Sequence, residues 1–355
     1  MHANGDVVCS IIDGRGDFVL GNVHEASLPA ILAGPRARAL RELVLSTPDQ
    51  YCRAVGKTCA LKTLEAPAGE DIATTLRFLA IEPTTTCDLR CLSCPVRDIA
   101  GDTSWRDAYR DGGAAFLAWD GLRRAKQHAA DVVQALVPAS WIPPVPERSR
   151  AMALLLRGRI PAARRGTLPI DVLKRVVSEA GPGIERVDLF NYGEPFLYPR
   201  LVEALRHVRQ QMPAAVIALS TDGQHVRETT EIDIVDGRLA DCLVFSVDGC
   251  DEAGYQRYRI GGTFARAWAN LSRCATRARG TAVKVVWQYV VFSWNDSDVQ
   301  LRRAIEMARE LDVPIWFDFA HTWGRSRRHP DELRYLTPYL RPFTALPGES
   351  RREGW

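Results

Sequence analysis

The chain has 355 residues, of which 46% are hydrophobic and 25% charged, and its formal net charge is +3. This length accommodates one large domain and a small one, and a nearly neutral charge gives no indication of nucleic acid or a membrane surface as partner. The sequence has no apolar run long enough to cross a membrane, and its first residues lack the basic and apolar regions of a signal peptide. We therefore expect a cytoplasmic protein.

Three parts are predicted along the chain. Residues 1–66 contain an expected hairpin, in which Val7–Ile12 and Phe18–Leu20 flank a glycine-containing turn, and then a helix-rich stretch. Residues 67–325 form the large domain, interrupted at about residues 100–165 by a polar-to-basic insertion with a proline-rich break. Residues 326–355 are a C-terminal extension.

In the large domain, apolar β-rich segments alternate with segments of helical period. The expected strands are Arg77–Pro83, Arg186–Asn191, Val216–Thr221, Leu243–Asp248, Val283–Phe292 and Ile315–Ala320. The expected helices are Pro169–Ala180, Arg200–Gln211, Phe264–Ala278 and Asp298–Leu311. This alternation is typical of a parallel sheet that right-handed crossovers curl. The predicted fold class is α/β, a partial (β/α)6 barrel with its chemistry at the carboxyl ends of the strands.

The nine cysteines fall into three groups: Cys9, Cys52 and Cys59; Cys87, Cys91 and Cys94; Cys242, Cys250 and Cys274. In a cytoplasmic chain, tight clustering favours metal ligation over disulfides. The second group has the spacing C-x3-C-x2-C just after the first strand, and such thiolates converge on one [4Fe–4S] cluster whose fourth iron has no cysteine. The alternative is a zinc site, although zinc normally takes four ligands in paired spacing.

Four downstream segments make the chain resemble the radical S-adenosylmethionine (SAM) superfamily. Asn191–Pro195 is similar to the family's Gly-Gly-Glu-Pro, with Tyr192 in place of the first glycine, and Leu219–Gly223 is similar to Ser-Thr-Asn-Gly. Phe245–Gly249 with Tyr255–Gly262 is similar to a signature of the SPASM/twitch branch. The resemblance covers residues 77 to about 322, and it implies a [4Fe–4S] cluster and S-adenosyl-L-methionine as cofactors.

The resemblance also implies roles for single residues. Glu194 is expected to accept the methionine amino group, while Ser246 and Arg259 contact the methionine carboxylate and the ribose. A guanidinium offers a bidentate fork to a carboxylate, which suits Arg259. Gln288 matches a polar position near the ribose, and Ser220 belongs to the third-strand motif. The residue before the third cysteine is Ser93, where the family usually has an aromatic side chain.

The N-terminal part resembles a SPASM module. Gly21–Leu32 is similar to the family's Gly-Asn-Ile-x-Glu-x-Ser-Leu segment, with Cys9 before it and Cys52 and Cys59 after it. The resemblance implies an auxiliary iron–sulfur cluster held by these cysteines, in a module that precedes the barrel instead of following it. Because a full SPASM domain has more cysteines, three possibilities stay open: a further ligand from elsewhere, an open iron, or a module that has lost its cluster.

For the reaction, the resemblance implies reductive cleavage of S-adenosylmethionine to a 5′-deoxyadenosyl radical that abstracts hydrogen from a substrate C–H. Sugar- and antibiotic-modifying epimerases are the group that the chain resembles, so we expect epimerisation of a carbon centre in a sugar-containing natural product. Cys250, just past the fourth strand, is the predicted hydrogen donor, whereas Cys242 and Cys274 are expected to pack in the interior.

Other outcomes stay open. The chain is alternatively a dehydrogenase of an alcohol or aminoglycoside that uses an auxiliary cluster, or a peptide maturase. From a different class, a non-enzymatic iron–sulfur redox sensor would need the cysteines but not the motifs at the later strands. The expected partners are a small sugar-containing substrate and an external electron donor such as flavodoxin or ferredoxin.

Overall fold

The computed structural model describes residues 1–9, 19–46, 76–91, 94, 165–320 and 326–342. The centre of the fold is a six-stranded parallel sheet with the order β3-β4-β5-β6-β7-β8, which is also the order along the chain. Its strands are Phe78–Ala80, Arg186–Asp188, Val216–Thr221, Cys242–Ser246, Lys284–Val291 and Ile315–Phe319. In the described residues β3 and β8 are the two edges. The predicted α/β fold, an open barrel of six parallel strands, is confirmed.

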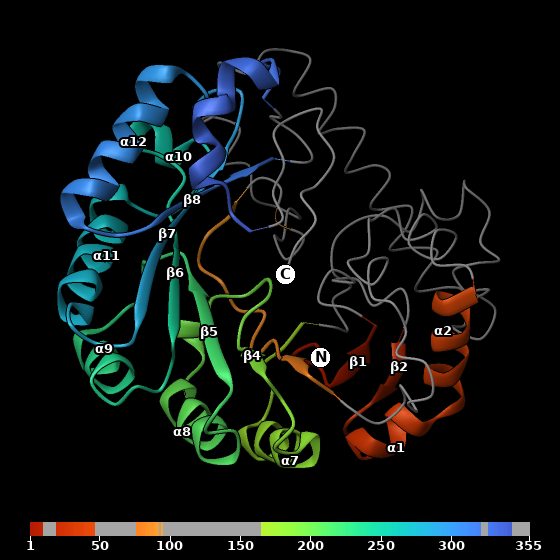
Figure 1. The fold of residues 1–355 in the computed structure, drawn as a ribbon. Helices are drawn as coiled ribbons and strands as arrows, with labels where there is room; N and C mark the ends of the chain where they lie inside the picture. The colour runs from red at the N-terminus through yellow and green to blue at the C-terminus, as the bar shows by residue number, and fades with distance from the viewer. Residues whose placement is uncertain (10–18, 47–75, 92–93, 95–164, 321–325, 343–355) are drawn as a thin grey trace.

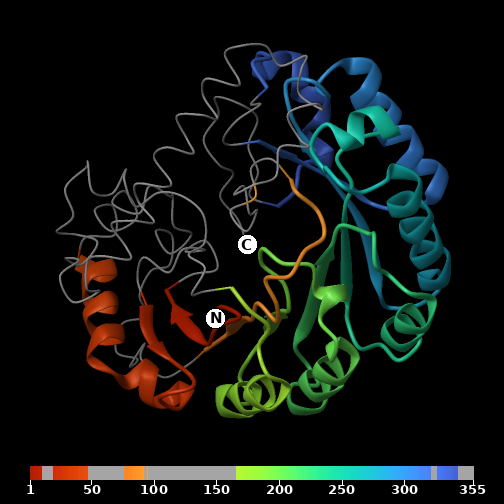
Figure 2. The same cartoon turned by 180° about the vertical axis from the view of Figure 1, so that it is seen from behind.

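Helices cover the convex side of this curved sheet, as the two opposite views show (Figure 1, Figure 2). They are α7 (Ile170–Ala180), α8 (Leu201–Gln211), α9 (Glu228–Val235), α10 (Glu252–Gln256), α11 (Phe264–Ala278) and α12 (Asp298–Leu311), with a 3₁₀ turn, η6, at Pro195–Leu197. Strand residues that face the helices are apolar and buried: Trp287 of β7, for example, packs edge-on against Trp268 of α11 with ring centroids 5.0 Å apart. Because side chains alternate along a strand, the neighbouring positions face the concave side.

Five of the six expected strands end earlier than predicted, two of them by a single residue and three by two or three residues. The strands expected to reach Pro83, Asn191 and Asp248 end at Ala80, Asp188 and Ser246. The chain leaves the ladder there because its polar groups bond to other loops: the backbone N–H of Glu82, for instance, donates to the Met1 carbonyl at 2.9 Å. The missing strand residues therefore belong to the loops that build the site.

The N-terminal part is a small unit beside α7 (Figure 1). It consists of β1 (Asp6–Val8), paired antiparallel with β2 (Val19–Asn22), followed by α1 (Leu28–Ala33) and α2 (Pro35–Ser46). The predicted hairpin is confirmed in its two strands, while its turn lies outside the described residues. A hydrogen bond of 2.7 Å from the Leu28 N–H to Glu179 of α7 fastens the unit to the barrel.

The C-terminal part covers the other end of the sheet. The 3₁₀ segment η7 (Pro330–Tyr339) precedes Leu340, which forms a parallel bridge with Phe317 of β8. In the part of the chain that the structure describes, no helix combines the length and the apolar character that a membrane crossing requires.

A buried carboxylate joins two of the outer helices. The side chain of Glu231 in α9 is 0% exposed and receives the Arg277 guanidinium of α11 at 2.8 Å, together with that of Arg273. Asp236 also pairs with Arg277, at 3.1 Å, but its side chain is 51% exposed. The two acids therefore offer a matched comparison at one arginine.

We expect Glu231→Ala to lower the free energy of unfolding by about 2–4 kcal/mol, because it leaves partly buried guanidinium groups unpaired. Asp236→Ala removes an exposed pair and is expected to cost less than about 1 kcal/mol. Urea denaturation followed by tryptophan fluorescence measures both. Equal losses in the two variants would contradict the burial argument.

Candidate active site

The loop after β3 carries the three clustered cysteines, and it is held first by the loop after β4. The backbone N–H of Glu194 donates to the Thr86 carbonyl at 2.9 Å. Gly193 lies so close that a Cβ atom there would come within 2.0 Å of the Thr84 carbonyl oxygen. Only glycine allows this approach, so backbone packing against the cysteine loop explains the glycine of the Gly-Glu-Pro sequence.

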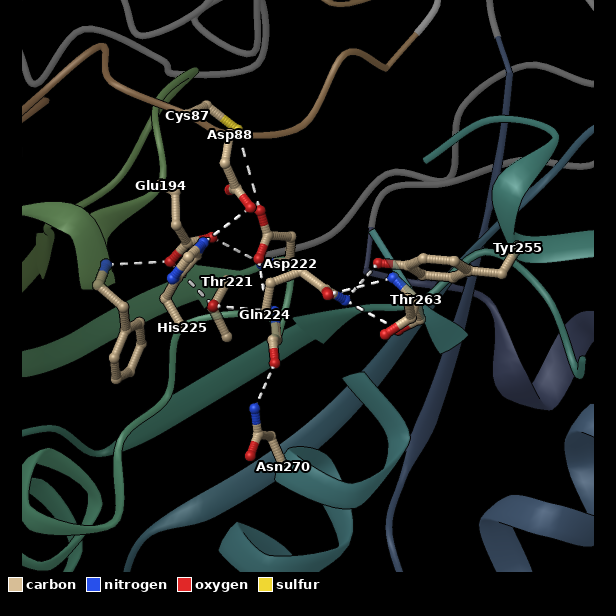
Figure 3. Close-up of polar contacts among 12 residues, drawn as sticks. Cys87, Asp88, Glu194, Thr221, Asp222, Gln224, His225, Tyr255, Thr263 and Asn270 are labelled. Atoms are coloured by element: carbon tan, nitrogen blue, oxygen red, sulfur yellow. Dashed lines mark hydrogen bonds and ion pairs between the residues drawn. The ribbon is translucent and has the colours of Figure 1, made fainter. Parts of the chain in front are cut away.

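The loop after β5 holds the cysteine loop at a second point (Figure 3). The Cys87 thiol lies 3.9 Å from a carboxylate oxygen of Asp222, and the His225 ring lies 2.7 Å from Asp88. The ligand atoms of Cys87, Asp88 and Asp222 all lie within 4.8 Å of one another. The sequence alone gave no role to Asp222 or Asp88. The one indication was that Asp222 stands where the Ser-Thr-Asn-Gly motif has Asn, which places a carboxylate at this position.

A third set of contacts comes from the segment after β6. The Arg90 N–H donates to the Ile260 carbonyl at 2.8 Å, and Arg259 Nη1 lies 4.0 Å from the Cys91 sulfur. Arg259 Nε in turn donates to Asp248 at 2.6 Å, and the Asp248 side chain is 0% exposed. Burial alone would lower the pKa of Arg259, but the charges of Asp248 and Cys91 raise it well above its usual range. The guanidinium therefore stays charged beside the cysteine loop.

The surroundings of the three thiols bear on the predicted iron–sulfur cluster. The Cys94 N–H donates to the Cys91 carbonyl at 3.1 Å, so these two cysteines lie close together. Burial raises the pKa of Cys91 to about 12, although the charge of Arg259 lowers it, and burial also raises the pKa of Cys87. Thiolates in such a place need a compensating positive charge, which bound iron supplies. The chemistry of this donor set thus agrees with the predicted cluster.

Glu194 is a buried carboxyl group beside this loop. It is 2% exposed and accepts hydrogen bonds from the Thr221 hydroxyl (2.9 Å), the Asp222 N–H (2.8 Å) and the Phe196 N–H (3.0 Å) (Figure 3). Burial raises its pKa well above the usual range, and the charge of Asp222 adds to the shift. A carboxylate has about four lone-pair sites, so a ligand donor has room for one further bond.

Three further predicted residues lie in a row on the concave face of the sheet. The hydroxyl oxygens of Ser220 in β5 and Ser246 in β6 are 3.4 Å apart. Ser246 is paired with Gln288 in the register of β6 and β7. The structure therefore brings Ser220, Ser246 and Gln288 together; the two serines lie at the ends of β5 and β6, and Gln288 lies within β7.

Cys250 lies elsewhere. Its thiol is 3.5 Å from the Gln300 carbonyl of α12, on the helix-covered side of the sheet, and it packs against the hydrophobic core. Burial raises its pKa to about 12. Among the contacts of the described residues, none joins this thiol to the cysteine loop or to the row of Ser220, Ser246 and Gln288. Cys274 is fully buried in α11.

The N-terminal cysteines are only partly described. Cys9 follows β1 and is half-buried, whereas Cys52 and Cys59 lie outside the described residues. The auxiliary cluster and the SPASM-like character of residues 1–66 therefore stay predictions.

No protein-family model and no curated protein matches the chain. Among solved structures, it is similar to anSMEcpe with bound AdoMet and Kp18Cys peptide, at 15% identity and a TM-score of 0.41 over 74% of this chain and 58% of that one. It is also similar to BtrN in complex with AdoMet and 2-DOIA, at 12% identity and a TM-score of 0.32 over 60% and 56% of the two chains.

A radical SAM methyltransferase from Sphaerobacter thermophilus is similar at 16% identity and a TM-score of 0.37, over 49% of this chain and 55% of that one. The chain thus spans a little over half the length of each of these structures. The chemistry that we infer for the chain rests on its own residues.

After anaerobic reconstitution with iron and sulfide, Cys91→Ala is expected to bind about four irons fewer per chain than the unaltered protein, because one cluster loses a ligand. Cys274→Ala is the matched control: it also removes a buried thiol, but from α11, and should keep all of the iron. Iron and sulfide content and visible absorption measure the difference. About eight irons in the unaltered protein would indicate an auxiliary cluster as well, and full iron content in Cys91→Ala would contradict the site.

Proposed function

We propose that the chain is a radical SAM enzyme in which Cys87, Cys91 and Cys94 bind a [4Fe–4S] cluster. One observation carries the proposal: the loops that follow β4, β5 and β6 all contact the cysteine loop, and they bring a carboxyl group and a guanidinium to it. When bound, the cluster and S-adenosylmethionine supply a carbon-centred radical that abstracts hydrogen from a substrate. A zinc site or a redox sensor requires no such convergence of charged groups.

The residues around the loop suit the ends of an amino acid. Glu194 retains a lone pair for an ammonium group, and its other hydrogen bonds keep the carboxyl group in place. Arg259 donates through Nε to Asp248, and its Nη1 lies 4.0 Å from the Cys91 sulfur. A guanidinium has five N–H donors, so those that remain on Nη1 and Nη2 can bind a carboxylate. Ser220, Ser246 and Gln288 provide hydroxyl and amide groups for a ribose. We assign Glu194 to the amino group of S-adenosylmethionine, Arg259 to its carboxylate and the three polar side chains to its ribose.

For the substrate, we propose a small sugar-containing molecule, whose carbon centre is epimerised if a thiol such as Cys250 returns a hydrogen atom to the opposite face of the substrate radical. Two half-buried side chains of β8, Trp316 and Asp318, occupy alternate positions on the concave side of the sheet. An indole stacks on the apolar face of a sugar and a carboxylate accepts hydrogen bonds from hydroxyl groups, so this pair supports a carbohydrate. Dehydrogenation of a similar substrate is the second outcome of the same radical step.

The reaction itself is tested by reducing the reconstituted protein with dithionite in the presence of S-adenosylmethionine. We expect 5′-deoxyadenosine to form, because Glu194 and Arg259 would hold S-adenosylmethionine beside a cluster bound by Cys87, Cys91 and Cys94. Liquid chromatography with mass spectrometry measures it, and Cys91→Ala should form none. A fully loaded protein that forms no 5′-deoxyadenosine would rule out the proposed enzyme.

The role of Cys250 is tested by its reactivity. A hydrogen donor must face the substrate, but the thiol lies against the Gln300 carbonyl of α12, and burial raises its pKa to about 12. Because the thiolate is the reactive form, we expect N-ethylmaleimide to label Cys250 in the folded protein at least about tenfold more slowly than an exposed thiol. Mass spectrometry of tryptic peptides measures this, with buried Cys274 as the slow reference. Rapid labelling at neutral pH would support the predicted donor role.

A further inference from the structure

Glu82 follows β3, and it is a buried acid to which the motifs give no role. It is 1% exposed, and its two carboxylate oxygens accept hydrogen bonds from two distant segments. The Ala3 N–H donates to Oε2 at 3.3 Å, and the Tyr192 N–H donates to Oε1 at 3.1 Å. The ring of His2 also lies 3.4 Å from Oε2. A buried carboxylate is costly unless its oxygens are satisfied, so both segments depend on this one group.

On one side, Glu82 holds the N-terminal unit. The Met1 nitrogen donates to the Ala80 carbonyl at 2.7 Å, and the Glu82 N–H donates to the Met1 carbonyl at 2.9 Å. Residues 1–3 thus lie along the free edge of β3, and His2 is 1% exposed in this contact.

On the other side, Glu82 holds the segment that carries Glu194. Tyr192 is followed by Gly193, which packs on the Thr84 carbonyl, and by Glu194, whose N–H donates to Thr86 at 2.9 Å. Gly193 and Glu194 directly follow Tyr192 in the chain, so a shift of Tyr192 would move both of them. The carboxyl group of Glu194 would then leave the position in which Thr221 and Asp222 hold it.

We propose that Glu82 is a positioning residue that couples docking of residues 1–3 to placement of Glu194. The part that concerns S-adenosylmethionine rests on the proposed function, whereas the coupling between the two segments does not. Glu82→Gln isolates the effect: an amide is of equal size, but it offers one acceptor oxygen where two N–H groups need one each. Glu82→Asp keeps both acceptor oxygens on a shorter side chain, so we expect its effect to lie between that of Glu82→Gln and the unaltered protein.

Glu179→Gln is the matched control. Glu179 also fastens the N-terminal unit, through the Leu28 N–H at 2.7 Å, but it lies in α7, where its hydrogen bonds are with Leu28 and Arg175. Hydrogen–deuterium exchange of the protein without cluster separates the two acids. We expect Glu82→Gln to speed exchange about tenfold both in residues 1–5 and in residues 190–195, since about 1.4 kcal/mol corresponds to a factor of ten. Glu179→Gln should speed exchange near Leu28 only.

Faster exchange of residues 1–5 alone in Glu82→Gln would overturn the coupling. In the reconstituted protein, equilibrium dialysis of S-adenosylmethionine should give a Kd about tenfold higher for Glu82→Gln and unchanged for Glu179→Gln, at equal iron content. An unchanged Kd in Glu82→Gln would overturn the positioning role. If the unaltered protein binds no S-adenosylmethionine, the proposed function itself fails, and the exchange measurement still decides the coupling.

Discussion

Parallel pairing of the strands in chain order is the constraint on which the rest of the structure depends. Because β3 to β6 run the same way, their carboxyl ends meet at one edge, and loops that are more than a hundred residues apart become neighbours. Residues 81–91, the part of the cysteine loop next to β3, form no helix or strand, so their shape depends on these neighbours. Gly193, Asp222 and Arg259 each come from a different strand end and each contacts that loop.

The charged groups at this edge are arranged so that burial does not leave them unpaired. Asp248 accepts from Arg259 with one oxygen and from the Val290 N–H with the other, at 2.6 and 2.7 Å. Glu194 and Glu82 are likewise satisfied by several donors. Such pairs add little net stability, since desolvation offsets their attraction, but breaking one leaves an uncompensated charge. The main effect of these hydrogen bonds is to orient the charged side chains at the site, and their contribution to the free energy of unfolding is small.

The periodicity of the sequence was sufficient to predict the order of strands and helices, since apolar positions repeat with clear helical and strand periods. The spacing of Cys87, Cys91 and Cys94 and the later motifs were sufficient to predict which segments meet. The partners of Glu82 and the closeness of Asp222 to Cys87 were not predictable, because loop-to-loop contacts leave no periodic trace. The direction of Cys250 was not predictable either: side chains alternate only within the ladder, and the chain leaves it after Ser246.

The two edges of the open sheet have a further consequence. Residues 1–3 take up hydrogen-bonding groups on the outer side of β3, and Leu340 and Arg341 do the same for β8. A barrel that does not close exposes two rows of backbone groups, which are templates for strand addition by other molecules. Here residues 1–3 and 340–341 take up part of both rows, which leaves fewer backbone groups for strand addition.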